Sequence, residues 1–237
     1  EMLARFQPKF LYLIPIFQNP TGMTLSQKRR EQVVQLAQER NFMVVADEVY
    51  HFLNYVDTSP RPFAIHTDIE NIISLGSFSK ILAPGLRLGW IQAHPQKIAH
   101  FVNCGLLDSG GGLNPFTSAI VRAVIESGDL EANINKLIQI YRERVKVMDS
   151  ALKQYLPEVK YKVPQGGYFF WVKLPDQMDA EVFQKNAESF KVGFRSGVRF
   201  SSQGGLCDYI RLCYVHYEPD EIEQGVLRLK QCLDGGG

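Results

Sequence analysis

The sequence has few of the residues that build metal sites and disulfide frameworks. Its 237 residues include only four cysteines, with no Cys-x-x-Cys pair, and five histidines. No spacing typical of a metal-ligand set occurs among them; they are Cys104, Cys207, Cys213, Cys232, His51, His66, His94, His100 and His216. The sequence therefore predicts a reduced, metal-free protein of the cytoplasm.

Two further shortages limit the class of partner. Lys and Arg number 26 against 25 Asp and Glu, so the net charge of +1 offers no basic excess for binding nucleic acid. No apolar run approaches the ~20 residues that a membrane helix needs. We expect neither a nucleic-acid nor a membrane partner for this segment. With 45% hydrophobic residues, the chain can instead bury a sizeable core.

Apolar runs alternate with a helical pattern in the first half of the sequence. The expected strands are Phe10–Phe17, Phe42–Ala46, Asn71–Leu75 and Leu88–Ala93, and the expected helix is Gln27–Arg40, capped by Thr24 or Ser26. The run Phe10–Phe17 is almost continuously apolar, which is typical of a strand buried on both faces of a parallel sheet. This order predicts an α/β fold with a mainly parallel sheet.

The second half of the sequence predicts more helix and a second sheet. The expected elements are helices over Pro95–Leu107, Phe116–Glu126, Asp129–Tyr155, Asp179–Phe190 and Glu218–Leu233, and strands within Val159–Leu174, Val192–Phe200 and Tyr209–Tyr217. The helix Asp129–Tyr155 is long enough to run from one domain into another. We expect part of a large domain over residues 1–130 and a smaller α+β domain over residues 131–237.

Lys80 lies in the segment Ser74–Trp90, which reads SLGSFSKILAPGLRLGW and follows an apolar strand. One interpretation is a solvated lysine, with serines in a turn and Arg87 paired with a carboxylate. The other is a phosphate site, because Ser77, Ser79 and nearby backbone N–H groups can bind an anion that a guanidinium also holds. A lysine beside such a phosphate is available for covalent chemistry with a carbonyl group. Pyridoxal phosphate supplies both groups.

Polar residues follow the other expected strands as well. Asn19, Asp47 and Lys80 each come just after a different strand, and parallel strands end at a common edge, so we expect one shared cleft. Asp47 is either a turn cap or the partner of a pyridine nitrogen, which it would keep protonated. Tyr50 and Asn19 either serve packing and the turn or bind the ring's phenolic oxygen.

Arg211 lies in the alternating stretch Tyr209–Tyr217 and shares a face with Tyr209 and Cys213. An arginine among apolar neighbours is costly unless it is paired. It either forms an ion pair with a protein carboxylate or binds the α-carboxylate of a substrate.

Three of these segments together resemble the class I and II aminotransferases of the pyridoxal-phosphate fold type I. They are NPTG at Asn19–Gly22, DEVY at Asp47–Tyr50 and SFSKILAPGLRLGW at Ser77–Trp90. PQGGYFFWVKLP at residues 164–175 is similar to the family's entry into its small domain. The lysine segment is most similar to the subgroup of 2-aminoadipate and kynurenine aminotransferases and the effector domains of MocR-type regulators.

The resemblance implies a fold and a set of roles. The fold would be a three-layer α/β/α large domain without its N-terminal portion, followed by a small α+β domain. The opening Glu1–Phe6 has the pattern of a helix end, which also leads us to expect a fragment. By resemblance, Lys80 is the Schiff-base lysine, Asp47 the pyridinium partner, Asn19 and Tyr50 ligands of the phenolic oxygen, Ser77, Ser79 and Arg87 the phosphate ligands, and Arg211, with Asn19, a substrate ligand.

The resemblance also implies three local features. The Asn19–Pro20 peptide bond is expected to be cis. The loop Asp108–Pro115 is expected near a subunit boundary of a homodimer. Ser196–Gly197 stands where the family commonly has Pro-Gly, a departure that concerns the substrate side of the site.

The function implied is a pyridoxal-phosphate-dependent aminotransferase that moves an amino group between an L-amino acid and a 2-oxo acid. Alternatives on the same scaffold are a C–S lyase or a decarboxylase. Outside enzymes, a MocR-type effector domain would use the cofactor site as a sensor. A truncated, inactive piece is a further alternative.

Overall fold

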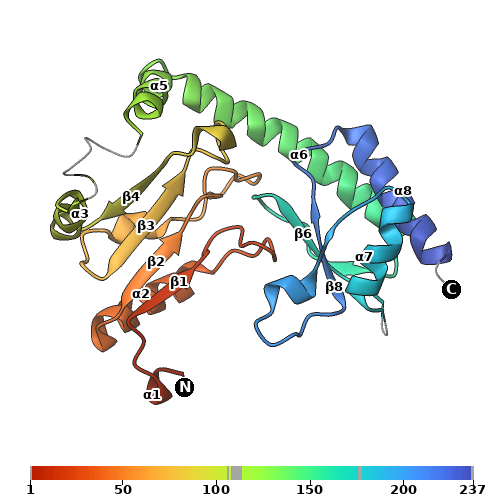
Figure 1. Cartoon of the computed structure of the whole chain (residues 1–237), viewed down its shortest axis with the longest axis horizontal. Coiled ribbons are helices and arrows are strands. Elements are labelled where there is room, and N and C mark those ends of the chain that lie inside the picture. The colour runs from red at the N-terminus through yellow and green to blue at the C-terminus, as the bar shows by residue number, and fades with distance from the viewer. Residues whose placement is uncertain (1, 106, 108–113, 176–177, 236–237) are drawn as a thin grey trace. The chain divides into compact units, whose positions relative to one another are not determined.

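A computed structural model of the chain describes residues 2–105, 107, 114–175 and 178–235 (Figure 1). The chain forms two compact units. The first contains Glu1–Ile16 and Met23–Leu137, and the second contains Phe17–Gly22 and Ile138–Gly237. The long helix α6 (Asp129–Tyr155) begins in the first unit and continues into the second. No helix within the described ranges is both long and apolar enough to cross a membrane.

The first unit is built on a four-stranded sheet with the order β1-β2-β3-β4. Its strands are β1 (Phe10–Leu13), β2 (Met43–Asp47), β3 (Ile72–Ser77) and β4 (Gly89–Ala93). The pairs β1/β2 and β2/β3 are parallel and β3/β4 is antiparallel, which confirms the expected mainly parallel sheet.

Strand β1 differs from its prediction in length and in burial. It ends at Leu13 instead of Phe17, because Pro15 interrupts the run and Phe17 has a positive φ of 49°. Phe10 and Tyr12 are 60% and 52% exposed, so the expected burial on both faces is wrong. In the described chain β1 is an outer strand that pairs only with β2.

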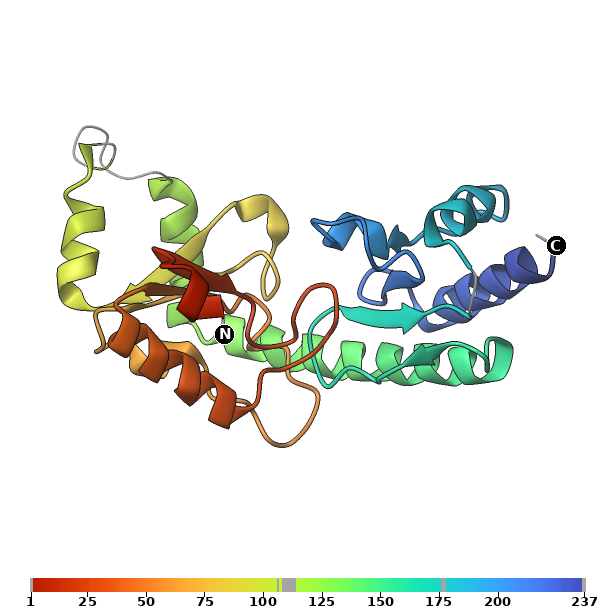
Figure 2. The same ribbon diagram turned by 90° about the horizontal axis from the view of Figure 1, so that it is seen from below.

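Helix α2 (Gln27–Arg40) covers one face of this sheet (Figure 2). Ser26, one of the two expected caps, accepts a hydrogen bond from the backbone N–H of Arg29. Asn41 ends the helix in the left-handed conformation that asparagine tolerates. The core between helix and sheet consists of Val34, Ala37, Phe42, Val44, Ala46, Phe63 and Ile72.

Shorter elements complete the first unit. They are α1 (Met2–Arg5), α3 (Pro95–Val102), α5 (Pro115–Glu126) and the 3-10 helices η1 (Phe63–His66) and η2 (Pro84–Leu86). Helix α3 ends at Val102, before the expected Leu107. Residues 108–113 of the expected loop lie outside the described part of the chain, and Asn114 caps α5 by accepting from the Thr117 N–H.

The second unit contains an antiparallel sheet with the order β5-β6-β8-β7. Its strands are β5 (Lys160–Tyr161), β6 (Phe169–Lys173), β7 (Arg195–Ser196) and β8 (Tyr209–Cys213), and its further helices are α7 (Ala180–Ser189), η3 (Gly197–Phe200) and α8 (Pro219–Gly235). Helices α7 and α8 pack together. Arg144 of α6 joins the chain leading into α8, because it donates to the Val215 carbonyl and pairs with Glu218 at 2.6 Å.

Candidate active site

Asp47 and Lys80 follow neighbouring parallel strands. Asp47 is the last residue of β2 and lies opposite Leu75 of β3, and the next backbone N–H, of Glu48, donates to the Leu75 carbonyl at 2.9 Å. Strand β3 ends at Ser77, three residues before Lys80. The structure therefore brings the two residues to the same edge of the sheet, as the sequence predicted for a ligand site.

The two oxygens of the Asp47 carboxylate differ in their surroundings. Oδ2 accepts a hydrogen bond of 2.5 Å from the Tyr12 hydroxyl. Oδ1 is buried and has no hydrogen-bond partner among the described residues. A buried acceptor without a donor is costly, and so such an atom points to a missing partner. The protonated nitrogen of a pyridine ring is a donor that fits Oδ1.

Tyr12 is the residue that the sequence reasoning missed. Partial burial and the bond to Asp47 raise the pKa of its hydroxyl to about 12, so that it stays a donor well above neutral pH. Tyr12 lies opposite Val45 in β2, and alternation along a strand returns to that face at Asp47. The alternation of residues along the strands could have suggested that Tyr12 and Asp47 share a face. The register of β1 against β2, however, is not visible in the sequence.

The expected phosphate ligands lie in the turn after β3. The backbone N–H of Ser79 donates to the Ser77 hydroxyl at 3.1 Å. The backbone N–H of Phe78, between them, donates to the Leu88 carbonyl. Arg87, next to Leu88, adopts a left-handed conformation with φ of 51°. Its exposed guanidinium donates to the Pro84 carbonyl at 3.2 Å. A backbone hydrogen bond thus joins the turn that contains Ser77 and Ser79 to the segment that contains Arg87. The Arg87 side chain itself bonds only a carbonyl three residues earlier in the sequence, among the contacts described.

The segment after Asp47 is anchored by Glu48, which is 5% exposed. Its carboxylate accepts hydrogen bonds from the N–H groups of Phe63 and Ala64 and from the Ser74 hydroxyl, at 2.8, 3.1 and 2.7 Å. These bonds tie the turn to η1 and to β3. Tyr50, two residues on, is also buried. Glu48 therefore fixes the backbone that carries Asp47 and Tyr50.

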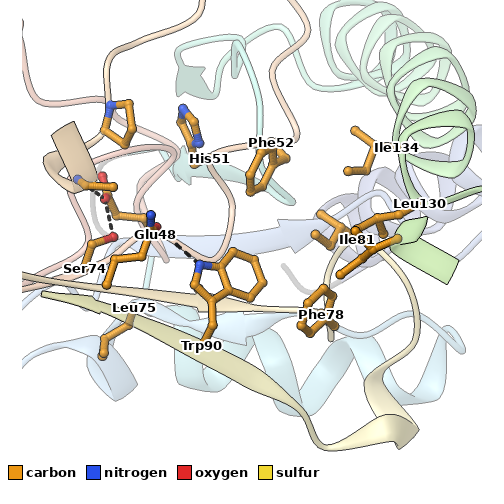
Figure 3. A pocket seen from close by; sticks show the side chains of 15 residues that line it. Glu48, His51, Phe52, Ser74, Leu75, Phe78, Ile81, Trp90, Leu130 and Ile134 are labelled. Carbon is orange, nitrogen blue, oxygen red and sulfur yellow. Dashed lines mark hydrogen bonds between the residues drawn. The ribbon is translucent and has the colours of Figure 1, made fainter. Parts of the chain in front are cut away.

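A cavity of about 610 Å³ in the first unit is lined by Glu48, Ala64 and Ser74 among others (Figure 3). Its walls are mainly apolar and include Phe52, Phe78, Trp90 and Ile134. None of the site residues predicted from the sequence lines it. Its lining includes the Glu48 carboxylate, which already accepts hydrogen bonds from Phe63, Ala64 and Ser74.

The second unit brings Asn19 and Arg211 together. Arg211 donates to the Asn19 side-chain oxygen at 2.7 Å. Its guanidinium lies 4.1 Å from the Phe169 ring centre and 5.1 Å from that of Phe200. Aromatic faces hold a guanidinium in a fixed plane and leave its edge for hydrogen bonding. The Asn19–Pro20 peptide bond is cis, as the resemblance implied.

The placement of Asn19 beside Asp47, Tyr50 and Lys80 stays a prediction, because Asn19 belongs to the second unit and the others to the first. No group of three or more His, Cys, Asp or Glu side chains suited to a metal occurs in the described residues.

The family model "Aminotransferase class I and II" matches residues 5–229. The chain belongs to the class I and II aminotransferase family. Three curated relatives cover 92% or more of it. They are aromatic-amino-acid aminotransferase 1 of Thermococcus litoralis (34% identical, covering 95% of this chain), 2-aminoadipate transaminase of Thermus thermophilus (35%, 99%) and the uncharacterized HTH-type transcriptional regulator YdfD of Bacillus subtilis (29%, 92%).

A solved aminotransferase structure has the same fold. LysN, the α-aminoadipate aminotransferase of Thermus thermophilus, matches 99% of the chain with a TM-score of 0.90 at 33% identity. That protein was solved with N-(5'-phosphopyridoxyl)-L-leucine. The match covers 61% of the LysN chain, and the three curated relatives are covered over 54%, 60% and 45% of their lengths. This chain therefore spans about half the length of the curated relatives that it matches.

Proposed function

We propose that this chain is part of a pyridoxal-phosphate-dependent aminotransferase, which moves an amino group between an L-amino acid and a 2-oxo acid. The observation that carries the proposal is the buried Oδ1 of Asp47, which has no hydrogen-bond partner among the residues that the structure describes, at the sheet edge where Lys80 also lies. The family and the LysN complex with a phosphopyridoxyl amino acid support it.

Each predicted site residue has a part in this proposal. Asp47 keeps the ring nitrogen protonated, and Asn19 and Tyr50 hold the phenolic oxygen. The Ser77 and Ser79 hydroxyls and the Arg87 guanidinium hold the phosphate, for which Arg87 exchanges its bond to the Pro84 carbonyl. Arg211 binds the α-carboxylate of the substrate, with Asn19 beside it.

When bound, pyridoxal phosphate supplies an aldehyde for the substrate amine and a ring that takes up electrons from Cα. Lys80 would hold the cofactor through its aldehyde carbon in the absence of substrate. Its amine, once free, would take up the proton from the substrate Cα. Asp47 lowers the barrier to this transfer by stabilising positive charge at the ring nitrogen. Arg211 fixes the substrate by its carboxylate, which keeps the reacting carbon in place.

The wider setting belongs to the same proposal. The substrates are an amino acid and a 2-oxo acid, and the active form is a homodimer in the cytoplasm. The first residues, to about 130, form the C-terminal part of the cofactor-binding domain, and residues 131–237 form the small domain. The net charge of +1 gives this segment no basic excess for binding nucleic acid.

The test is an amino-transfer assay of the chain with added pyridoxal phosphate, an amino acid and 2-oxoglutarate. We expect glutamate and the matching 2-oxo acid, together with the visible absorbance of a lysine-bound cofactor. Lys80→Ala should abolish the absorbance and turnover, and the exposed Lys28→Ala should change neither. Full activity of the Lys80→Ala variant would refute the assignment. Release of ammonia or an amine instead of glutamate would point to a lyase or a decarboxylase.

A second candidate is an effector domain of a transcription regulator, which the similarity to YdfD favours. Such a domain keeps the cofactor site and uses it to sense a ligand. The same assay separates the two functions, because an effector domain takes up the cofactor on Lys80 without forming the 2-oxo acid.

A further inference from the structure

Tyr12 and Asp47 lie on one face of the sheet, on adjacent strands. Tyr12 of β1 is opposite Val45 of β2, and Asp47 is the next residue of β2 on that face. The tyrosine hydroxyl donates to Asp47 Oδ2 at 2.5 Å, a length typical of a hydrogen bond between a hydroxyl and a carboxylate. The bond joins residues 35 positions apart in the sequence and spans two strands.

This bond determines the direction of the other carboxylate oxygen. The two oxygens of a carboxylate are rigidly joined, so a donor on Oδ2 restricts rotation of the whole group. Oδ1 is then left buried, with no partner in the described part of the chain. Tyr12 is 52% exposed, and therefore its hydroxyl is not needed to fill the core. With its pKa raised to about 12 by burial and by Asp47, the hydroxyl remains protonated at neutral pH.

We propose that Tyr12 is a positioning residue that holds Asp47 by Oδ2, so that Oδ1 faces the ring nitrogen of pyridoxal phosphate. Tyr12 itself touches neither the cofactor nor the substrate in this role. The inference rests on the proposed cofactor, and it adds a residue from β1 to a site predicted from the ends of β2 and β3.

The first experiment needs no cofactor. Tyrosine labelled with ¹³C at Cζ reports the ionisation of each hydroxyl by NMR, and Tyr12→Phe assigns the signal. In the wild-type chain the Tyr12 signal should remain that of a neutral phenol through the usual tyrosine range. Asp47→Asn should lower the pKa of Tyr12 toward that range, because the bond to a carboxylate is lost while the partial burial remains. A Tyr12 that titrates at the ordinary value, whether or not Asp47 is present, would overturn the proposal.

The second experiment adds pyridoxal phosphate labelled with ¹⁵N. We expect Tyr12→Phe to weaken cofactor binding about 10-fold, because a hydrogen bond to a charged group is lost. The ring-nitrogen signal should also move toward the unprotonated form, while borohydride still traps the cofactor on Lys80. Tyr161→Phe is the matched control, since it removes a tyrosine bond to another carboxylate, Asp149, in the second unit.

The outcomes separate the two hypotheses. Unchanged binding and an unchanged nitrogen signal in Tyr12→Phe would contradict the role of Tyr12 while leaving the proposed function intact. A wild-type chain that takes up no cofactor would contradict the proposed function for this chain, and the titration of Tyr12 would still decide whether it holds Asp47.

Discussion

At the scale of single residues, the structure separates two adjacent carboxylates that look alike in the sequence. Glu48 is buried and accepts hydrogen bonds from Phe63, Ala64 and Ser74. Asp47 accepts one, from Tyr12, and keeps a buried oxygen without a partner in the described chain. A fully satisfied carboxylate stabilises the fold, whereas an incompletely satisfied one is available to a ligand. The hydrogen bonds thus indicate a structural role for Glu48 and support the proposed role of Asp47.

We expect Glu48→Gln to destabilise the first unit by about 2 kcal/mol, because the amide group turns a donor toward a buried N–H donor. Chemical denaturation followed by circular dichroism measures the free energy of unfolding. The exposed Glu70→Gln is the control and should have no effect. Equal stability of the two variants would mean that Glu48 does not anchor the turn after β2.

Arg211 gives a prediction about substrate binding. Its guanidinium is held between Phe169 and Phe200 and bonds Asn19, a geometry that a lysine ammonium cannot reproduce. In an active form of the enzyme, Arg211→Lys should raise KM for the amino acid about 30-fold. Steady-state kinetics would measure this change. Arg228→Lys, a control that alters an exposed arginine bonded to the Lys191 carbonyl, should keep the wild-type KM. The same KM in both variants would exclude Arg211 as the carboxylate ligand.

The residue types of the candidate site could be read from the sequence, and part of their geometry could not. Asp47 and Lys80 each follow an apolar strand, a position that strand prediction gives directly. The Tyr12 contact depends on the register between β1 and β2, which is set by the packing of the whole sheet. The bond between Asn19 and Arg211 joins residues 192 positions apart, so local patterns contain no sign of it.

At the scale of elements, the turn that carries Lys80 depends on the packing of β3 against β4. Gly76 lies opposite Trp90, and a Cβ at position 76 would stand 2.0 Å from the indole ring. The indole also contacts the Phe78 ring, with centres 4.8 Å apart (Figure 3). Gly76 therefore allows the indole to lie against the backbone directly before Ser77. The requirement for glycine here comes from this close approach.

We expect Gly76→Ala to destabilise the first unit by about 2 kcal/mol, because the methyl group overlaps the Trp90 ring. Adding Trp90→Leu should recover part of this loss, and a double-mutant cycle would measure the coupling. Gly193→Ala is a suitable control, since a Cβ there meets nothing within 4 Å. If the losses from Gly76→Ala and Trp90→Leu were simply additive, the close approach would not explain the glycine.

Helices were easier to predict than strand ends. Helix α2 spans Gln27–Arg40 as its pattern and its Ser26 cap indicated, and α6 spans the expected Asp129–Tyr155. Strand β1 is shorter than predicted because the prediction followed the apolar run past Pro15, which lacks the N–H that a strand needs. Apolar composition thus indicated where β1 lies, but proline chemistry determined where it ends.

At the scale of the whole molecule, the chain combines an α/β unit with a unit built on an antiparallel sheet. The alternation of strands and helices before α6 predicted the first, and the alternating strand patterns after it predicted the second. The first unit contains the proposed lysine and carboxylate, and the second contains the proposed substrate arginine. The curated relatives that the chain matches are almost twice as long, so the activity of the whole protein stays a proposal.

The most direct test of the central claim is to locate the covalent bond to the cofactor. The chain would be incubated with pyridoxal phosphate, reduced with borohydride, digested and mapped by mass spectrometry. The account predicts one modified peptide containing Lys80, and loss of that modification when Asp47→Ala weakens retention of the ring. Modification of other lysines in place of Lys80, or equal labelling of Lys80 and exposed lysines such as Lys28, would contradict it.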